Sequence, residues 1–546
     1  MRMLFAALAA ALLLAVGCVA SPPTEDSIAE RPRLVVVIIV DGLPQRQVVD
    51  YRDQLVPGGL RRFLDRGAWF ANAHYGHSLT VTAAGHATVM TGAHPDRHGI
   101  IANEWRDLRT WEPQYCTADA GATYIGHNTH RLDGTSPRNL KVETVGDVLR
   151  RASASSKVIS VSGKDRGAIL PAGKSGVAYM YQLQSGEFAS STYYMPAHPA
   201  WVEAFHRAKP ADAYFHAEWK PLLDEAAYAR SLPDDRPEYL EGGRLPKVMG
   251  ARDAKAGPLF YGSLLASPFI DQLTLDFARA AIAGEGLGRD DVPDILALSL
   301  SGHDYVNHSY SAESRLSHDH LLRLDRMLET FFRHLDVTVG EGKYVAVLTA
   351  DHGFTPFPEL SRALGRDAGR FDPRPPLARV EAGLAKRFGA GRWLRGFSAD
   401  TLVFNRALAA EKGVDLDELA EEARRLLAAE PGVAAIYTRA ELESGSREGA
   451  PYFRQMRRSW NRELSGDLQM ALKPYWIFSS GSGNATTHGS PHPNDTHVPI
   501  LFYGPPWVKP GRIDAAVDVV DIAPTLAAML GIAAPAASEG KVLPLR

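Results

Sequence analysis

The segment TVTAAGH, at residues 80–86, contains the side chain best suited to act as a nucleophile. Helix-forming residues follow from Ala83 to Met90, so Thr82 stands where a serine or threonine typically caps a helix. A hydroxyl in this position lies beside free backbone N–H groups and the positive end of the helix dipole, which stabilise an anion. Taken alone, the stretch favours a plain N-cap, because capping threonines far outnumber nucleophilic ones. Residues elsewhere in the chain decide between the two interpretations.

Three aspartates closely follow apolar runs that are rich in β-branched residues. Asp41 follows residues 33–40, Asp304 comes after 294–300, and Asp351 follows 343–350. Such runs are typical of strands buried on both faces of a parallel sheet. Open α/β sheets bind ligands at the carboxyl ends of their strands, so we expect the three carboxylates to share one edge. The alternative for Asp41, taken singly, is that it starts a turn with the glycine that follows it.

Histidines accompany two of these carboxylates. His352 is adjacent to Asp351, and His308 follows Asp304 by four residues, so that one helical turn places both on one side. His488 joins them from the C-terminal part of the chain. Six oxygen and nitrogen ligands suffice for two metal ions; histidines favour Zn²⁺, and carboxylates also admit Mg²⁺ or Mn²⁺. For the Asp304 and His308 pair, the alternative is a capped helix with a surface histidine.

Two cations stand one residue apart after a further predicted strand at residues 158–162. Lys164 and Arg166 lie within the segment GKDRG, and this spacing allows both to bind one phosphate. An exposed basic loop is the alternative. Asn103 follows a turn-rich link at 92–100 and is expected in a loop.

In this order, the motifs resemble the alkaline phosphatase superfamily, in particular its PafA-like members with a threonine nucleophile, which are related to nucleotide pyrophosphatases. The motifs span most of the chain: VDG at 40–42, TAAGH at 82–86, Asn103 before EW, KDRG at 164–167, Asp304 with His308, DHG at 351–353 and THG at 487–489. Each motif is weak by itself, but their ordered conjunction is specific.

The resemblance implies two Zn²⁺ ions per chain. One would be held by Asp304, His308 and His488. The other would be held by Asp41, Asp351, His352 and the oxygen of Thr82. Thr82 would attack phosphorus to form a phosphothreonine intermediate. The non-bridging phosphate oxygens would be held by Asn103, Lys164 and Arg166, where charge is spread in a loose transition state.

The resemblance also separates the branches of the superfamily. Lys164 and Arg166 favour a phosphate monoesterase, because the related diesterases generally lack this pair and offer an apolar pocket instead. The sulfatase branch needs a Cys/Ser-x-Pro-x-Arg motif, which the segment after Thr82 does not match. A phosphodiesterase or nucleotide pyrophosphatase stays open, as does a non-catalytic protein that binds a phosphate ligand. The remaining neighbouring histidines are expected to be structural: His86, His303 and His497.

Composition limits the function further. The chain has 546 residues and is 45% hydrophobic, so it can bury a large core. Its 60 Lys and Arg against 63 Asp and Glu give a net charge of -3, which provides no basic field for nucleic acid. The predicted substrates are small-molecule phosphate monoesters held by local charges. With only two cysteines, a metal site must be built from Asp and His.

The first residues predict export. A charged start and an apolar run at residues 3–17 have the shape of a secretory signal. The segment AVGC at 15–18 resembles a bacterial lipobox, in which Cys18 becomes lipidated, while ordinary cleavage after Ala20 is the alternative. The predicted location is the periplasm or a bacterial membrane, with membrane attachment only through this lipid.

We expect an α/β fold, a three-layer α/β/α sandwich with a mostly parallel central sheet and inserted cap segments. The predicted boundaries are a signal peptide at 1–20, a linker at 21–32, and a catalytic core at 33–193, 268–356 and 474–546. The core is interrupted by an irregular insertion at 194–267 and by an α+β cap at 357–473. In the cap, helical periodicity covers residues 416–430 and a strand follows at 433–437.

Overall fold

The computed structural model describes residues 31–232, 243–479 and 484–546. The predicted signal peptide, Cys18 and nearly all of the linker lie outside the described residues, as does part of the first insertion. Residues 31–546 form one unit of the structure. In the described part of the chain, no helix combines the length and apolarity needed to cross a membrane.

A nine-stranded sheet lies at the centre, in the order β19-β2-β18-β11-β1-β10-β5-β6-β7. Its parallel middle consists of β11 (Tyr344–Thr349), β1 (Leu34–Val40), β10 (Asp294–Leu300), β5 (Val158–Ser162) and β6 (Val177–Gln182). The outer strands are β7 (Glu187–Ala189), β18 (Ile500–Tyr503), β2 (Ala68–His74) and β19 (Gly511–Asp518). Only β7 and β18 run antiparallel to their neighbours in this middle part. The mostly parallel sheet is as predicted.

The register of the middle strands aligns their carboxyl ends. Val40 of β1 pairs with Leu300 of β10, and Ile39 pairs with Thr349 of β11. All residues of β1, β10 and β11 are buried, because helices cover both faces of the sheet. The segments that follow these strands therefore begin side by side at one edge.

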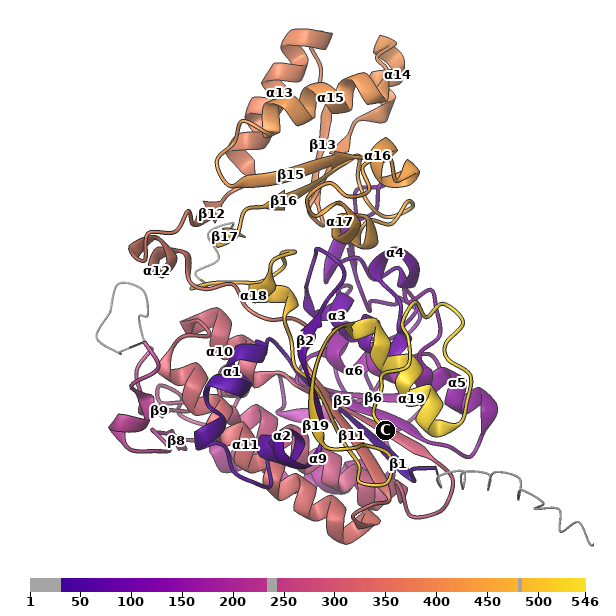
Figure 1. Ribbon diagram of the computed structural model, residues 1–546, viewed down its shortest axis with the longest axis vertical. Helices are drawn as coiled ribbons and strands as arrows, with labels where there is room; N and C mark the ends of the chain where they lie inside the picture. Colours follow the sequence, from indigo (N-terminus) through magenta and orange to yellow (C-terminus); the bar gives the residue numbers. More distant parts are fainter. Residues whose placement is uncertain (1–30, 233–242, 480–483) are drawn as a thin grey trace, which may run out of the picture. The chain divides into compact units, whose positions relative to one another are not determined.

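Helices form a layer on each face, as Figure 1 shows. One layer contains α9 (Pro268–Glu285), α10 (Gly302–Tyr310) and α11 (Arg315–Leu335), with the shorter α1 (Gln45–Asp50) and α2 (Leu60–Arg66). The other contains α3 (Thr82–Thr91), α5 (Val145–Ala152), α6 (Asp165–Ala172) and α19 (Ile522–Leu530). The predicted three-layer α/β/α sandwich is confirmed.

The segment after β7 carries more helix than its irregular sequence predicts. Its elements are α7 (Ala200–Ala208), β8 (Glu218–Trp219), β9 (Lys247–Val248) and α8 (Pro258–Leu264). Short elements elsewhere in the core are α4 (Pro95–His98), β3 (Glu104–Arg106), β4 (Pro113–Tyr115), α12 (Pro358–Ala363) and α18 (Pro493–Thr496).

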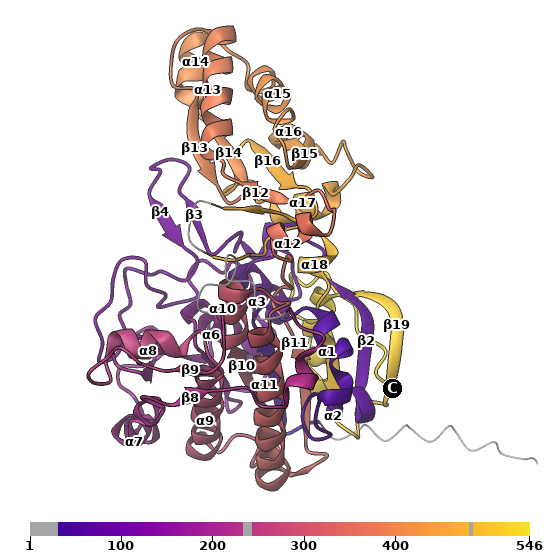
Figure 2. The ribbon, with the colours of Figure 1, turned by 90° about the vertical axis from the view of Figure 1, so that its left-hand side faces the viewer.

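A second sheet, in the order β13-β14-β16-β15, belongs to the cap. Its strands are β13 (Leu394–Ser398), β14 (Thr401–Phe404), β16 (Leu468–Leu472) and β15 (Val433–Thr438). The cap helices are α13 (Arg374–Phe388), α14 (Arg406–Lys412), α15 (Leu416–Leu427), α16 (Arg439–Ser444) and α17 (Phe453–Ser459). Figure 2 shows the cap helices α13 and α15 beside the strands of this sheet. Trp393 and Leu419 belong to a hydrophobic core cluster formed within the cap. The chain enters and leaves the cap through β12 (Gly369–Phe371) and β17 (Trp476–Phe478), which pair in parallel.

One local prediction needs correction. Thr82 is the first residue of α3, and Val81, with extended backbone angles, occupies the N-cap position without a side-chain cap bond. The hydroxyl of Thr82 is therefore not used to cap the helix, which removes the simpler interpretation of this residue. Cys116 is buried and is a free thiol.

Candidate active site

The three predicted aspartates meet around one imidazole nitrogen. His352 Nε2 lies 3.5 Å from Asp41 Oδ1, 3.4 Å from Asp351 Oδ2 and 3.9 Å from Asp304 Oδ1. Asp41 and Asp351 follow β1 and β11 directly, while Asp304 lies in the first turn of α10. All three carboxylates are buried. Because the parallel strands end at the same height in the sheet, side chains that are far apart in the sequence lie close together here.

A glycine allows this close approach. Gly42 has a φ of 70°, and its N–H donates a hydrogen bond of 3.0 Å to Asp351 Oδ1. A Cβ atom at this position would lie 3.0 Å from the Phe354 ring and 3.1 Å from Asp304 Oδ1. The Asp-Gly pair therefore does more than start a turn, because a side chain at residue 42 would crowd the Asp304 carboxylate and the Phe354 ring.

The predicted histidines are oriented by backbone carbonyl groups. The Nδ1 atoms lie 3.1 Å from Thr486 O for His308, 2.9 Å from Gly353 O for His352 and 2.8 Å from Thr80 O for His488. A carbonyl oxygen only accepts, so in the neutral ring each Nδ1 carries the hydrogen and each Nε2 presents a lone pair. From His308 and His488, Nε2 lies 3.4 Å and 3.7 Å from Asp304 Oδ1.

These donors fit divalent metal ions. Ligand atoms lie within 4.8 Å of one another in two groups: Asp41, Asp351 and His352, and Asp304, His352 and His488. Several of them are buried without a hydrogen-bond partner in the described structure: Oδ1 of Asp41, Oδ1 of Asp304, Oδ2 of Asp351 and Nε2 of His352. Unpartnered buried oxygen and nitrogen atoms of this kind are what Zn²⁺ or a similar ion requires. His352 belongs to both groups here, whereas the resemblance assigns it to one.

Thr82 is tied to the same carboxylates through its own helix. His86 Nδ1 lies 2.8 Å from Thr82 O and 3.3 Å from Asp351 Oδ2, while its Nε2 contacts Ser299. A Cβ atom at Gly85 would lie 2.1 Å from Asp351 O, so only glycine lets α3 pack this closely. The expected structural role of His86 thus has a specific form, which is to hold the start of α3 against Asp351.

The residues predicted to bind phosphate lie around this centre. Asn103 Oδ1 accepts a 2.8 Å hydrogen bond from the N–H of Ala83, which leaves its amide nitrogen as a donor for a ligand. Lys164 Nζ lies 2.8 Å from Asp41 Oδ2 and forms a second ion pair with Asp304. Its flexible stem allows the ammonium group to reach between the two carboxylates, which the spacing in the sequence did not reveal.

Arg166 presents a largely unpartnered guanidinium group. Its Nη1 donates a 3.1 Å hydrogen bond to the hydroxyl of Tyr115, and its buried Nε has no partner in the described structure. Both residues line a cavity of about 840 Å³, together with Lys164 and Tyr305. The cavity is of a size that accommodates a small organic ligand.

The site concentrates negative charge in a buried volume. Burial opposes ionisation of Asp41, but Lys164 and His352 outweigh it and hold the pKa of this carboxyl well below its ordinary value. Burial and the charge of Asp41 raise the pKa of Asp351. Burial lowers the pKa of His352, but Asp351 and the other carboxylates raise it to about 9. The result is a potential that attracts cations.

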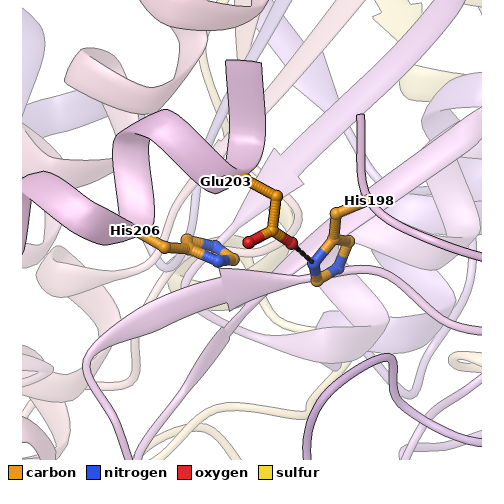
Figure 3. A group of neighbouring side chains, drawn as sticks. All are labelled: His198, Glu203 and His206. Atoms are coloured by element: carbon orange, nitrogen blue, oxygen red, sulfur yellow. Dashed lines mark ion pairs between the residues drawn. The ribbon is translucent and has the colours of Figure 1, made fainter. Parts of the chain in front are cut away.

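A third group of possible ligands lies away from this centre, at α7 (Figure 3). His198, Glu203 and His206 have ligand atoms within 4.8 Å of one another. However, the N–H of Ser190 donates a 3.0 Å hydrogen bond to His198 Nε2, so the neutral ring carries its hydrogen on Nδ1. That Nδ1 faces Glu203 Oε1 at 3.5 Å and has no lone pair to offer. The group is therefore a close histidine–glutamate contact rather than a set of free metal ligands.

Comparisons with known proteins show the family to which the chain belongs. Residues 35–494 match the family described as type I phosphodiesterase / nucleotide pyrophosphatase. The alkaline phosphatase PafA of Elizabethkingia meningoseptica is 34% identical over 517 residues, covering 94% of each chain. The chain belongs to this family. A Myroides odoratus protein named calcium-transporting ATPase is also 34% identical, over 94% of each chain.

The solved structures extend the likeness to the fold. A crystal structure of PafA matches with a TM-score of 0.87 at 33% identity, covering 94% of this chain and 98% of that one. Murine ectonucleotide pyrophosphatase / phosphodiesterase 5 matches with a TM-score of 0.52 at 13% identity, which shows a shared fold alone. The predicted membership of the PafA-like alkaline phosphatases is confirmed, and the chain is an enzyme of this class.

Two residues of the site were not predicted from the sequence. Tyr115 and Tyr305 contact the two cations that are predicted to bind phosphate: the Tyr115 hydroxyl accepts from Arg166, and Lys164 Nζ lies 4.9 Å from the centre of the Tyr305 ring. Tyr305 had a weak signal, because it follows Asp304 directly. Tyr115 had none, since it is 51 residues from its partner.

Proposed function

We propose that the chain is an exported, zinc-dependent phosphate monoester hydrolase that acts through a phosphothreonine intermediate on Thr82. The observation that carries this proposal is the set of three buried carboxylates around His352 Nε2, with the start of α3 held against them by His86. A purely binding protein has no need for a hydroxyl at this point, and Thr82 does not cap its helix.

We propose the same two groups of metal ligands that the resemblance implies. The first comprises Asp304, His308 and His488. The second comprises Asp41, Asp351, His352 and the Thr82 oxygen. When bound, two Zn²⁺ ions supply Lewis acidity, which lowers the pKa of a coordinated hydroxyl and stabilises negative charge on the leaving oxygen.

The proposed reaction then proceeds in two displacements at phosphorus. In the first, Thr82 Oγ1 releases its proton to solvent and bonds to phosphorus as the bond to the substrate alcohol breaks, and the alkoxide takes up a proton from solvent. In the second, water attacks phosphorus and the bond to Thr82 Oγ1 breaks. The water releases a proton, Thr82 Oγ1 takes one up, and inorganic phosphate leaves. Asn103 and Arg166 donate hydrogen bonds to the non-bridging oxygens throughout, and Lys164 adds positive charge beside them.

A second candidate, a phosphodiesterase, is favoured by the description of the matched family. Arg166 argues for monoesters, because its N–H donors suit the additional negative oxygen that a diester lacks. The test compares kcat/KM for 4-nitrophenyl phosphate and methyl 4-nitrophenyl phosphate, which share a leaving group. A higher value for the monoester and a phosphoryl group on Thr82 after acid quenching support the proposal, whereas a preference for the diester selects the second candidate.

Export and lipid attachment through Cys18 are part of this proposal, and they rest on the sequence of residues 1–20. The proposed substrates are small-molecule phosphate monoesters outside the cytoplasm, without nucleic acid as a partner. An exported location suits an enzyme that releases phosphate from monoesters that do not cross the membrane.

A further inference from the structure

A short hairpin connects two parts of the phosphate-binding apparatus. Strand β3 begins directly after Asn103, and β4 ends at Tyr115, with Glu104 paired to Tyr115. The N–H of Cys116 donates a 3.0 Å hydrogen bond to Asn103 O, which closes the base of the hairpin. A displacement of this hairpin therefore moves Asn103 and Tyr115 together.

The hydroxyl of Tyr115 is bound on two sides. It donates a 2.5 Å hydrogen bond to Asp165 Oδ1 and accepts the 3.1 Å bond from Arg166 Nη1. Burial and the charge of Asp165 raise the pKa of Tyr115 well above its ordinary value, so the hydroxyl keeps its single hydrogen. Since that hydrogen goes to Asp165, the oxygen is free to accept from Arg166.

This bond decides where the guanidinium group of Arg166 lies. Its nearest carboxylate oxygen, Asp165 Oδ1, is 3.9 Å from Nη1, beyond hydrogen-bond distance. Without the Tyr115 hydroxyl, Nη1 loses the hydrogen bond that the described structure shows for it, and a charge-assisted bond to Asp165 is the stronger alternative. Arg166 then turns toward Asp165 and loses its position beside the phosphate.

The cap holds the same hairpin from the other side. Ser398, at the end of β13, accepts a 2.8 Å hydrogen bond from the N–H of Arg106 in β3. Arg395 donates bonds of 3.1 Å and 2.7 Å to the carbonyls of Leu108 and Arg109, in the turn of the hairpin. A Cβ atom at Gly396 would lie 2.4 Å from the Trp111 ring, which shows how closely the two hairpins pack.

We propose that Tyr115 is a positioning residue that holds Arg166 for a dianionic phosphate, and that the β13–β14 hairpin of the cap fixes this arrangement by gripping the β3–β4 hairpin. The proposal rests on the proposed function for the role of Arg166. It makes the cap a contributor to the preference for monoesters, although none of its gripping residues lines the cavity beside Arg166.

The first experiment is a double-mutant cycle of Tyr115→Phe and Arg166→Ala in the zinc-loaded full chain. Its readout is the inhibition constant of inorganic phosphate, with kcat/KM for the paired monoester and diester. Tyr115→Phe should weaken phosphate binding and monoester kcat/KM by about tenfold, as expected for a hydrogen bond to a charged group, and change diester kcat/KM by less than about twofold. In the Arg166→Ala background the same substitution should have almost no effect.

Tyr124→Phe is the matched control, because it removes a hydroxyl from the same cavity. In the described structure this hydroxyl does not contact Arg166. Equal effects of Tyr115→Phe in the presence and absence of Arg166 would overturn the proposal, since they mean a merely structural role. The inhibition constant of phosphate measures the coupling between Tyr115 and Arg166 whichever ester the enzyme prefers. A wild-type preference for diesters would thus reject the proposed function without deciding the positioning role.

The second experiment tests the contacts between the cap and the β3–β4 hairpin. Ser398→Ala and Arg395→Ala should lower the ratio of monoester to diester kcat/KM by about two- to fivefold each, in the direction of Tyr115→Phe but with smaller size. Glu463→Gln is the control, because it breaks the ion pair with Lys141, a contact that does not involve the β3–β4 hairpin. If the ratio stays at the wild-type value in both test variants, or falls equally in Glu463→Gln, the role assigned to the cap is wrong.

Discussion

We expect the two proposed phosphate-binding residues, Lys164 and Arg166, to contribute unequally to phosphate binding, with the larger contribution from Arg166. In the described structure the guanidinium group of Arg166 makes one hydrogen bond, to a neutral hydroxyl. Its Nε is unpartnered there, and the Asp165 carboxylate lies 3.9 Å from Nη1. Lys164 already has ion pairs with Asp41 and Asp304, which offset much of its charge. More positive charge thus remains for the substrate at Arg166 than at Lys164.

The magnitudes follow from the strength of hydrogen bonds to charged groups, about 1.5–3 kcal/mol. Arg166 belongs at the upper end, so Arg166→Ala should lower monoester kcat/KM about a hundredfold, at ~1.4 kcal/mol per factor of ten. Lys164 belongs at the lower end, so Lys164→Ala should lower monoester kcat/KM about tenfold through the loss of its contact with the phosphate. The double variant should lose about two to four powers of ten and shift its preference toward diesters.

The assay is kcat/KM for the monoester and the diester with a common leaving group, at one pH and with zinc content measured by elemental analysis. Zinc content matters because Lys164→Ala removes a compensating charge from two buried carboxylates, and this changes their affinity for cations. Equal losses on both substrates at unchanged zinc content would refute the reasoning. So would a larger loss of monoester activity in Lys164→Ala than in Arg166→Ala.

Four further outcomes are expected. Thr82→Ala should abolish monoester turnover while zinc content stays near that of the wild type, and Thr82→Ser should retain substantial activity; a nearly normal rate in the alanine variant would exclude Thr82 as nucleophile. Dialysis against a chelator should remove activity, and Zn²⁺ should restore it better than Mg²⁺, because the histidine ligands favour the softer ion; full activity in protein shown to be metal-free would reject the two-zinc proposal. Burial raises the pKa of Asp400 to about 7, so its contribution to stability is complete below its unfolded pKa near 4 and is lost as the pH rises through 7. Asp400→Asn should therefore raise the unfolding temperature at pH 8 more than at pH 4, and an equal shift at both would show that the carboxyl does not titrate in this way. Cys18→Ala should prevent lipidation and release the protein into the soluble fraction, whereas a wild-type chain that starts unmodified at Ser21 would indicate ordinary cleavage.

The strands that carry the site were predictable because their sequences have few alternatives. Residues 158–162 and 294–300 are β5 and β10 in the structure, with the predicted bounds. A parallel strand that is buried on both faces is mostly apolar along its length, and the aspartates of the site come just after the strand ends. The convergence of Asp41 and Asp351 follows from that rule together with the parallel order of the sheet.

Other features depend on contacts that no local pattern encodes. The position of Thr82 at the start of α3 differs from the predicted cap by one residue, because Val81 adopts the extended backbone of the cap position. Lys164 lies between Asp41 and Asp304, which belong to different strand ends, and the sequence spacing of Lys164 and Arg166 says nothing of that placement. Tyr115 acquires its role through residues 50 and 51 positions away.

The place of the cap in the chain explains how it can contact the β3–β4 hairpin without disturbing the proposed metal ligands. It interrupts the sequence between His352 and His488, yet the flanking segments are joined directly: Thr486 Oγ1 donates a 2.8 Å hydrogen bond to Thr355 O. Its entry and exit strands β12 and β17 also pair with each other. Because the ends of the insertion are already held together, ordering the cap adds little loop-closure entropy and leaves the two histidines in place. The cap is thus free to contact the β3–β4 hairpin and to act on phosphate binding through Tyr115 rather than through the metal ligands.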